Sequence, residues 1–282
     1  MAESLTANER MEVYLTKVAT GPRMSKDLSV DEAQDGLSLV LEGAVSDVRA
    51  ALFLITTRMK LETVEENLGF WRALDQSTEK RQVAFDSLLQ VADAFDGFQR
   101  VPYFGFYVLP LLAKMGLPAY GHSARPLPPK FGVTFEDLLQ SHYGVGREST
   151  FKNRMDALNQ FRFGFIDTRQ CHPKLDALRD LRVEIVKRPM LATLEKLLMP
   201  LQAKRNYLAT NYFHPGYEVS MLAVARESAF DRVVIGNGME GGTLYGIHKR
   251  AKIFIQNETG ETEERLFDAE TFYGKTHGQR LK

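Results

Sequence analysis

The chain has 282 residues, of which 44% are hydrophobic and 26% charged, as expected for a folded globular protein with a substantial core. Its 36 Lys and Arg residues balance 36 Asp and Glu residues, which argues against a strongly basic nucleic-acid protein but leaves local basic patches open. The single cysteine excludes an internal disulfide, and the lack of a signal peptide or a long apolar run predicts a cytoplasmic protein without a membrane span.

The first third of the chain has the pattern of four short helices. Apolar residues recur at helical spacing over residues 8–19, and each of the next three helices begins with a typical N-terminal capping residue. These capping residues are Ser29 with Glu32, Ser46, and Thr63 with Glu66. Short connections between the helices predict a compact helical domain over residues 1–82.

After residue 82 the pattern becomes that of an α/β fold. A buried strand, a helix and a second strand form a β-α-β unit, which implies a parallel sheet with crossover helices. The expected strands are 88–92, 117–121, 161–166, 207–210, 233–235 and 253–256, and the expected helices are 104–115, 135–141, 151–159, 172–182, 190–198 and 217–227. We therefore expect an α/β fold class: an N-terminal helical domain, on which later helices can pack, and a mostly parallel sheet over residues 83–282.

The loop Asp93-Ala-Phe-Asp-Gly-Phe-Gln-Arg100 joins the first of these strands to its helix. Such turns bind phosphate when glycines let backbone N–H groups close on the anion and the helix N-terminus adds its dipole. Here Gly97 is the only glycine, next to Asp96 and bulky aromatic residues. Arg100 is either a phosphate ligand that replaces glycine amides or a surface arginine paired with a loop aspartate.

Two later segments carry further candidate ligands for an anion. They are His122, Arg125 and Lys130 in a proline-stiffened loop, and Arg169, His172 and Arg182 around an expected helix start. The first segment follows a strand, where ligands of α/β sheets bind, so we favour phosphate contact over a loop of solvated charges. The second segment suits an anion at a helix N-terminus, although His172 is equally suited to cap that helix.

Aromatic and basic groups elsewhere allow two further interpretations. Four aromatic residues near the first loop would offer stacking faces to bases, although such residues more often belong to a core. They are Phe95, Phe98, Tyr103 and Phe106. Basic clusters at 204–205 and 248–252 would extend a stripe for a polyanion only if they lie on the same face as Arg125 and Lys130.

The order of the segments and several local strings resemble the anthranilate phosphoribosyltransferase family. The strings 26–33, 42–47 and 50–60, followed by Glu62-Thr63, resemble its helical domain. The string 122–132 resembles its His-Gly-Asn-Arg loop. The string 163–166 with His172-Pro173, Arg182 and Arg188 resembles its Gly-Phe strand, His-Pro helix start and arginine pair. The resemblance covers nearly the whole chain. It implies the family's two-domain fold, with a ligand cleft between the domains.

The sequence departs from this family at the residues for diphosphate and magnesium. The family's Gly-Thr-Gly-Gly-Asp loop is absent, and Tyr103-Phe-Gly-Phe106 replaces the Asn-x-Ser-Thr that supplies hydroxyl groups. The family's Asp-Glu pair for magnesium falls near residues 238–243, where Glu240 is the only carboxylate. One glutamate supports magnesium poorly, so we expect no metal site and no cofactor.

Three strings resemble a divergent branch of the same family. They are Phe95-Asp-Gly-Phe-Gln-Arg100, Phe213-His-Pro215 and Gly238-Met-Glu-Gly241. Proteins of that branch are dimeric, and some bind nucleic acid without strong sequence preference. The resemblance implies a nucleic acid or a phosphorylated small molecule as partner. Together with the apolar segment 50–59, it also predicts a homodimer formed through the N-terminal helices.

We therefore expect a protein that binds nucleic acid or another phosphate-bearing ligand in the inter-domain cleft and has lost the parent transferase activity. The alternatives are an active glycosyl- or phosphoribosyltransferase with an altered substrate and a structural dimer without a ligand. We assign no catalytic residue. The expected ligand contacts are Asp96, Gly97, Arg100, His122, Arg125, Lys130, Arg169, His172 and Arg182.

Overall fold

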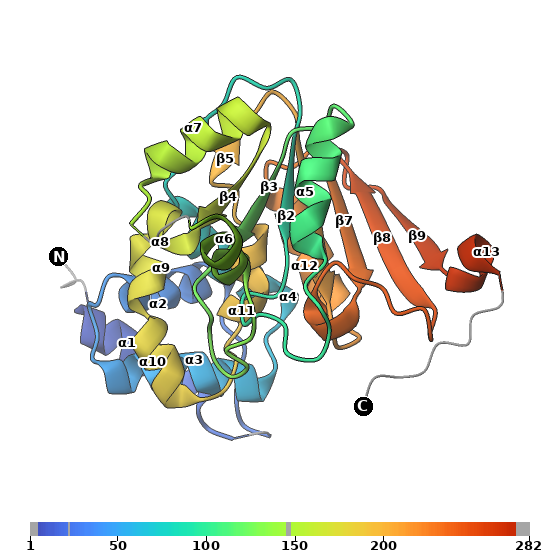
Figure 1. Ribbon diagram of the computed structural model, residues 1–282. Coiled ribbons are helices and arrows are strands. Elements are labelled where there is room, and N and C mark those ends of the chain that lie inside the picture. Colours follow the sequence, from blue (N-terminus) through green and yellow to red (C-terminus); the bar gives the residue numbers. More distant parts are fainter. Residues whose placement is uncertain (1–4, 22, 145–147, 275–282) are drawn as a thin grey trace.

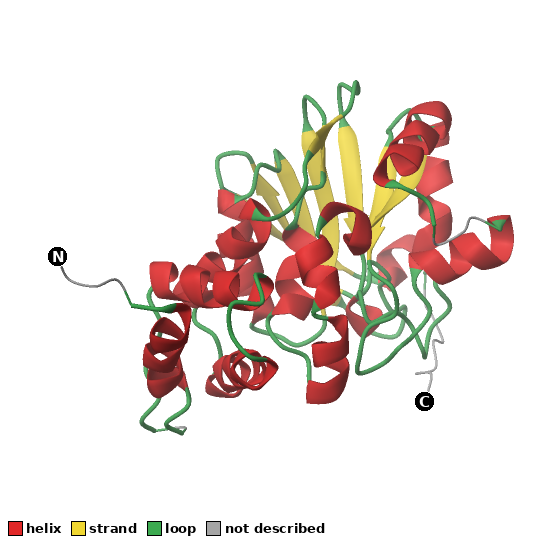
Figure 2. Cartoon of the chain, turned by 90° about the vertical axis from the view of Figure 1, so that its left-hand side faces the viewer, coloured by secondary structure: helices red, strands yellow, loops and turns green. Residues whose placement is uncertain are grey.

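The structure is a computed structural model that describes residues 5–21, 23–144 and 148–274. Figure 1 shows a group of helices from the start of the chain beside a twisted sheet that has further helices on its faces. The turned view in Figure 2 shows many of the helices gathered against one end of the sheet. The predicted combination of a helical part and an α/β part is confirmed.

The helical part is built from the four predicted helices. They are α1 (Ala7–Val18), α2 (Val30–Leu41), α3 (Asp47–Lys60) and α4 (Val64–Gln76). The three predicted caps are confirmed: Ser29 and Thr63 form capping boxes with Glu32 and Glu66, and the side chain of Ser46 accepts from Arg49 N–H. Each cap satisfies backbone N–H groups that the first helical turn leaves unpaired, so these starts are encoded locally.

The main sheet has seven strands in the order β4-β3-β2-β6-β7-β8-β9. The strands are β2 (Leu88–Ala92), β3 (Ala119–Ser123), β4 (Phe163–Asp167), β6 (Asn206–Tyr212), β7 (Arg232–Asn237), β8 (Ala251–Asn257) and β9 (Thr262–Phe267). The neighbouring strands β4, β3, β2, β6 and β7 are parallel, and β8 and β9 add an antiparallel edge. The predicted mostly parallel sheet is confirmed. Strand β9 was not predicted because its side chains are mainly charged and exposed, so it lacks an apolar run.

A short parallel pair and several helices complete the α/β part. The pair is β1 (Arg81–Gln82) with β5 (Leu201–Gln202), and the helices on the sheet are α5 (Gly105–Lys114), α6 (Phe135–Tyr143), α7 (Phe151–Phe161) and α12 (Tyr217–Glu227). Helix α13 (Ala269–Tyr273) follows the edge strand β9. The short helices are α8 (Thr168–Cys171), α9 (Pro173–Ala177), α10 (Arg179–Ile185), α11 (Leu191–Leu194), η1 (Glu195–Leu197) and η2 (Met239–Gly241). The single helix expected over 172–182 is wrong, because the chain turns at Leu178, which separates α9 from α10.

One hydrophobic core joins the two parts of the molecule. It runs from Phe53 and Phe70 in the helices through Leu197 to Leu208 and Val233 in the sheet. Helix α10 packs on α3, and α11 and η1 pack on α4, so later helices lie against the N-terminal ones. The domain boundary at residue 82 stays a prediction. Within the described part of the chain, no helix is both long and apolar enough to span a membrane.

Candidate ligand-binding cleft

A cleft of about 1120 Å³ lies between the helical part and the carboxyl ends of β2 and β6. Its walls are formed by the end of α3, the loops after β2 and β6, and the segment 186–196. The carboxyl ends of parallel strands are where ligands of α/β sheets bind. Of the residues expected from the sequence to contact a ligand, Asp96 and Arg182 line this cleft.

Asp96 and Lys130, two of the predicted ligand residues, meet at the edge of the cleft. Lys130 Nζ lies 3.2 Å from an Asp96 carboxylate oxygen, and Arg188 Nε donates to the other oxygen at 2.8 Å. Asp96 therefore holds two cations in place, and as a carboxylate it does not itself bind an anion. Arg188 is exposed and lines the cleft, so it is the more accessible of the two cations.

Gly97 is required by close packing of two loops. Its φ is 76°, in the left-handed region, and a Cβ there would overlap the carbonyl group of Gly132. Phe98 forms an antiparallel bridge with Val133 next to this contact. The glycine therefore holds the loop 93–100 against the segment around residue 132.

Glu240, in η2 after β7, holds the loop that follows β2. Its Oε2 accepts the backbone N–H of Gln99 at 3.2 Å, of Arg100 at 2.9 Å and of Val101 at 3.2 Å. We call these three N–H groups the amide nest. Lys130 Nζ donates to the Glu240 carbonyl oxygen at 3.3 Å and lies 3.8 Å from its Oε1. The Glu240 carboxylate thus accepts three consecutive N–H groups of the loop between β2 and α5.

A buried lysine anchors the loop that carries Glu240. Lys196 Nζ donates to the carbonyl oxygens of Asn211 at 2.9 Å and Gly241 at 3.1 Å. Burial lowers the pKa of Lys196 to about 8. Further along the loop, Thr243 N–H donates to the carboxylate of Asp93, whose pKa is raised by burial. The sequence around Lys196 gives no sign of this role, because a lysine in a short helix has no distinguishing local pattern.

Arg182 lines the cleft but is already paired. Its two terminal guanidinium nitrogens donate to Glu195 at 2.7 and 3.0 Å, and both side chains are buried. A buried charge is tolerated when it is paired and hydrogen-bonded in this way. Arg182 therefore forms part of the structural wall of the cleft rather than an open cation.

The two predicted histidines are fully buried and do not line the cleft. The ring of His122 contacts Phe95, with 5.2 Å between ring centroids, and burial lowers the pKa of His122 to about 3. His172 Nδ1 accepts Leu175 N–H at 3.1 Å, so His172 is the cap of α9, the alternative that the sequence had left open. Burial also lowers the pKa of His172 to about 4. Both rings are neutral structural groups near pH 7.

The remaining three predicted ligand residues lie outside the cleft lining. Arg125 donates to Asp176 at 2.7 Å, and Arg169 donates to Asp167 at 2.9 Å and also pairs with Glu136. The side chain of Arg100 is exposed and has no ion pair with any other residue that the structure describes. The structure therefore does not bring all the predicted cations to one surface.

The four aromatic residues predicted as alternative stacking faces belong to the core. Phe95, Phe98, Tyr103 and Phe106 are all at least 93% buried, so the stacking interpretation of these four is wrong. Phe98 and Tyr103 pack on each other, with 4.4 Å between ring centroids, and Tyr103 and Phe106 both pack on Phe135. A base has no access to their faces.

An exposed group of cations and rings lies instead at the mouth of the cleft. This cleft rim consists of Arg58, Lys187, Arg188, Phe213 and Tyr217. Lys187, Arg188 and Phe213 are exposed, and the Arg58 guanidinium lies 5.6 Å from the centroid of the Tyr217 ring. Within the described residues, Lys187 makes no ion pair. Sequence signals for the rim were Arg188 and Phe213, which lie in strings that resemble the family, but neither was assigned to a ligand contact.

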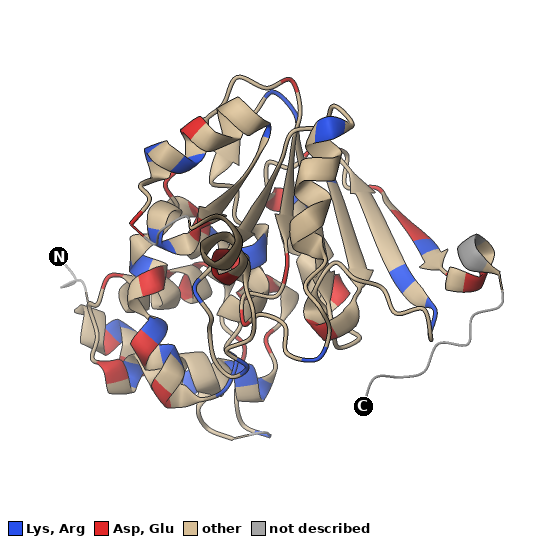
Figure 3. Ribbon diagram, viewed as in Figure 1, with Lys and Arg blue, Asp and Glu red and all other residues tan. Residues whose placement is uncertain are grey.

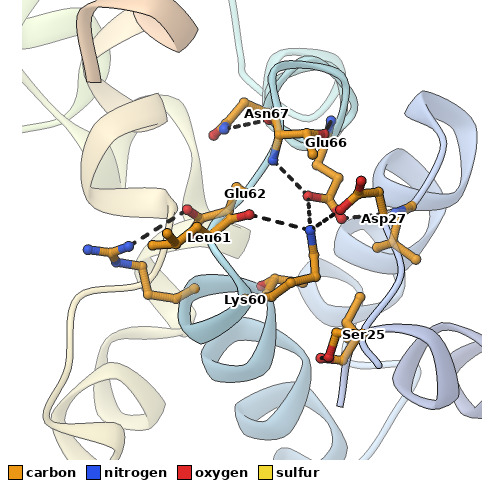
Figure 4. Close-up of polar contacts among 12 residues, drawn as sticks. Ser25, Asp27, Lys60, Leu61, Glu62, Glu66 and Asn67 are labelled. Carbon is orange, nitrogen blue, oxygen red and sulfur yellow. Dashed lines mark hydrogen bonds and ion pairs between the residues drawn. The ribbon is translucent and has the colours of Figure 1, made fainter. Parts of the chain in front are cut away.

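A polar cluster fixes the end of α3, where Arg58 is placed. Figure 4 shows Lys60 between Asp27 and Glu66, so the lysine ties the end of α3 to the start of α4 and to the segment before α2. Glu62 follows on the cleft wall, with its carboxylate 3.9 Å from Arg58. Burial raises the pKa of Glu62. The cluster thus orders one wall of the cleft.

The two basic clusters lie at opposite ends of the sheet, and neither contributes a residue to the cleft lining. Lys204 and Arg205 precede β6 and therefore lie at the amino end of the sheet, whereas the cleft lies at its carboxyl end. Arg250 pairs with Asp268, and Lys252 pairs with Glu264, on the antiparallel edge. Figure 3 shows Lys and Arg interspersed with Asp and Glu over this view of the molecule. A continuous basic stripe through both clusters is therefore ruled out.

A helical layer joined to a mostly parallel sheet, with a cleft between them at the strand ends, defines the phosphoribosyltransferase type of fold. Residues 13–78 match the family described as glycosyl transferase family, helical bundle domain. The structure is similar to that of anthranilate phosphoribosyltransferase from Thermus thermophilus, with a TM-score of 0.73 and 21% identity, over 94% of this chain and 74% of that chain.

Sequence comparison agrees with the fold. A protein of Aquifex aeolicus (strain VF5) is 30% identical over 217 residues, covering 77% of this chain and 64% of the relative. The anthranilate phosphoribosyltransferase of Persephonella marina (strain DSM 14350 / EX-H1) is 25% identical over 233 residues, covering 81% and 65%. In sequence and in fold the chain is thus similar to anthranilate phosphoribosyltransferases. It spans just under two thirds of the length of these two relatives.

Proposed function

We propose that this protein binds a phosphate-bearing ligand, a nucleic acid or a nucleotide, in the cleft and does not transfer a phosphoribosyl group to anthranilate. The observation that carries the proposal is the cleft rim, where the exposed cations Lys187 and Arg188 lie on the same cleft as the exposed ring of Phe213. Cations neutralise phosphates, and an accessible aromatic face stacks on a base. This combination suits single-stranded nucleic acid or its nucleotide units.

Loss of the transferase activity is supported by the position of Glu240. Its carboxylate accepts three backbone N–H groups of the loop in which the family resemblance implies a diphosphate. Magnesium bound to a diphosphate requires free carboxylate oxygens to complete its octahedron. Within the described residues, no group of three or more His, Cys, Asp and Glu side chains is arranged to hold a metal ion. The Glu240 carboxylate, held by these N–H groups, is not free to ligate magnesium.

Polyanion binding is tested with oligo(dT) and with adenosine monophosphate at several salt concentrations. Each phosphate neutralised on a single strand contributes roughly −0.7 to the slope of log K against log salt. The double variant Lys187→Ala/Arg188→Ala should therefore reduce the magnitude of the slope by roughly 1.4, and it should do so for unrelated sequences. The matched control is Lys204→Ala/Arg205→Ala, which removes the same charge at the amino end of the sheet.

Three outcomes decide between the interpretations. Equal weakening by both double variants, or binding that does not respond to salt, would overturn the assignment of the rim. Saturable binding of the nucleotide without binding of oligo(dT) would restrict the ligand to a small phosphorylated molecule. Turnover of anthranilate with phosphoribosyl diphosphate and magnesium at about 1 per second or faster would instead establish a working transferase.

The proposal includes a homodimer formed through the N-terminal helices and a location in the cytoplasm. Helix α3 exposes Val48, Leu52 and Met59, whose spacing places them on one side of the helix. Apolar residues gathered on a surface helix are typical of a contact between proteins. This α3 face reaches the cleft at Met59, so the proposed dimer contact would lie beside the cleft mouth.

A further inference from the structure

The amide nest has the geometry of an anion site. Three consecutive backbone N–H groups converge on one oxygen, Glu240 Oε2, at distances of 2.9 to 3.2 Å. Successive N–H groups that converge in this way form a concave site for phosphate or carboxylate. Lys130 Nζ lies 3.8 Å from the second Glu240 oxygen and adds a positive charge beside the nest.

The backbone around Glu240 is anchored, whereas its side chain borders the cleft. Glu240 has a φ of 52°, and the residues that follow are held by Lys196 through the Gly241 carbonyl, by Asn211 through the Gly242 carbonyl and by Asp93 through Thr243 N–H. Glu240 itself lines the cleft. Glu240 therefore contacts both the cleft and the nest, whereas Gln99, Arg100 and Val101 do not line the cleft.

We infer that Glu240 is a built-in occupant of a phosphate site, and that a phosphate group enters the amide nest only when the Glu240 carboxylate leaves it. The carboxylate and the phosphate compete because both are anions that accept the same three N–H groups. The contact is thus autoinhibitory for phosphate binding at this position. The inference rests on the proposed function, which places the phosphate-bearing ligand in the cleft. It concerns Glu240 and the amide nest, not the cleft rim.

The test measures the affinity of inorganic phosphate at constant ionic strength, by phosphorus NMR line broadening and by the rise of Tm. Glu240→Ala should bind phosphate at least about tenfold more tightly than the parent, because an open minor state is typically populated at about 10% or less. Glu240→Gln keeps the size of the side chain and removes its charge, so it should also bind more tightly if the alanine variant does not fold. Adding Lys130→Ala to Glu240→Ala should weaken the gained binding.

Glu218→Ala is the matched control, because Glu218 lies at the start of α12 and its removal changes the net charge equally. It should leave phosphate binding at the parent level. Folded Glu240→Ala and Glu240→Gln variants that bind phosphate no more tightly than the parent would overturn the inference, and so would an equal gain in Glu218→Ala. Oligo(dT) binding by the parent through Lys187 and Arg188 would survive that failure, so the two proposals fail separately.

Discussion

Single residues show how buried charges are satisfied within this molecule. Arg182 and Glu195 form an ion pair with two hydrogen bonds, and only 4% and 0% of their side chains are exposed. The pair joins α10 to η1 and thereby holds the segment 186–190, which carries two cations of the cleft rim. Removing one partner leaves the other as an uncompensated buried charge, which is more costly than removing both.

We predict that Arg182→Ala or Glu195→Ala lowers the free energy of unfolding by about 3–5 kcal/mol, measured by urea denaturation. The double variant should lose less than the sum of the two, since neither charge is then left alone. Asp156→Ala breaks the exposed pair with Lys152 and should change stability by less than about 1 kcal/mol. Losses that simply add in the double variant would contradict a coupled pair.

At the scale of elements, the contact between α2 and α4 depends on glycine. Gly69 in α4 lies against the start of α2, where a Cβ would overlap the Val30 carbonyl oxygen. The same two helices carry the capping boxes at Ser29 and Thr63, so local signals set where each helix begins. The absence of a side chain at Gly69 sets how closely they approach. This contact supports the helical wall of the cleft.

Gly69→Ala should lower the free energy of unfolding by about 1–3 kcal/mol, because the added methyl group overpacks the contact. Helix propensity alone predicts the opposite sign, a gain of up to about 1 kcal/mol. The sign of the change in urea denaturation therefore decides between the two effects. Glu65→Ala, at an exposed position of the same helix, should stay within about 0.5 kcal/mol of the parent. A more stable Gly69→Ala variant would refute the close contact.

At the scale of the whole molecule, two exposed apolar surfaces are candidates for association. Val48 and Leu52 lie on α3, whereas Tyr107 and Leu111 lie on α5. Figure 1 shows α3 among the N-terminal helices and α5 on the sheet, far from each other. A dimer through the N-terminal helices buries the first surface and leaves the second exposed.

If the dimer forms through α3, Leu52→Glu should convert a dimeric mass to a monomeric mass, measured by light scattering at micromolar protein. The reason is that a charge at the centre of a buried apolar contact is left without a partner. Leu111→Glu makes the same change on α5, where 60% of the side chain is exposed, and should leave the mass unchanged. A monomeric parent protein, or dissociation by Leu111→Glu alone, would contradict the predicted interface.

Sequence by itself determined the features that depend on near neighbours. The caps at Ser29, Ser46 and Thr63 were predictable because a cap and its partner N–H groups lie within three residues. Parallel strands such as β2 and β7 were predictable because each carries a short run of apolar residues. Strand β9 and the break at Leu178 were not, since neither has a distinctive local pattern.

Only the tertiary structure decided which polar groups face the cleft. Arg182 and His172 were expected from the sequence to contact a ligand, yet Arg182 is paired with Glu195 and His172 caps α9. Glu240 reaches the N–H group of Arg100 across 140 residues of chain. Such contacts depend on how whole elements pack and on which charges burial forces into pairs, and these long-range effects leave no signal in a local stretch of sequence.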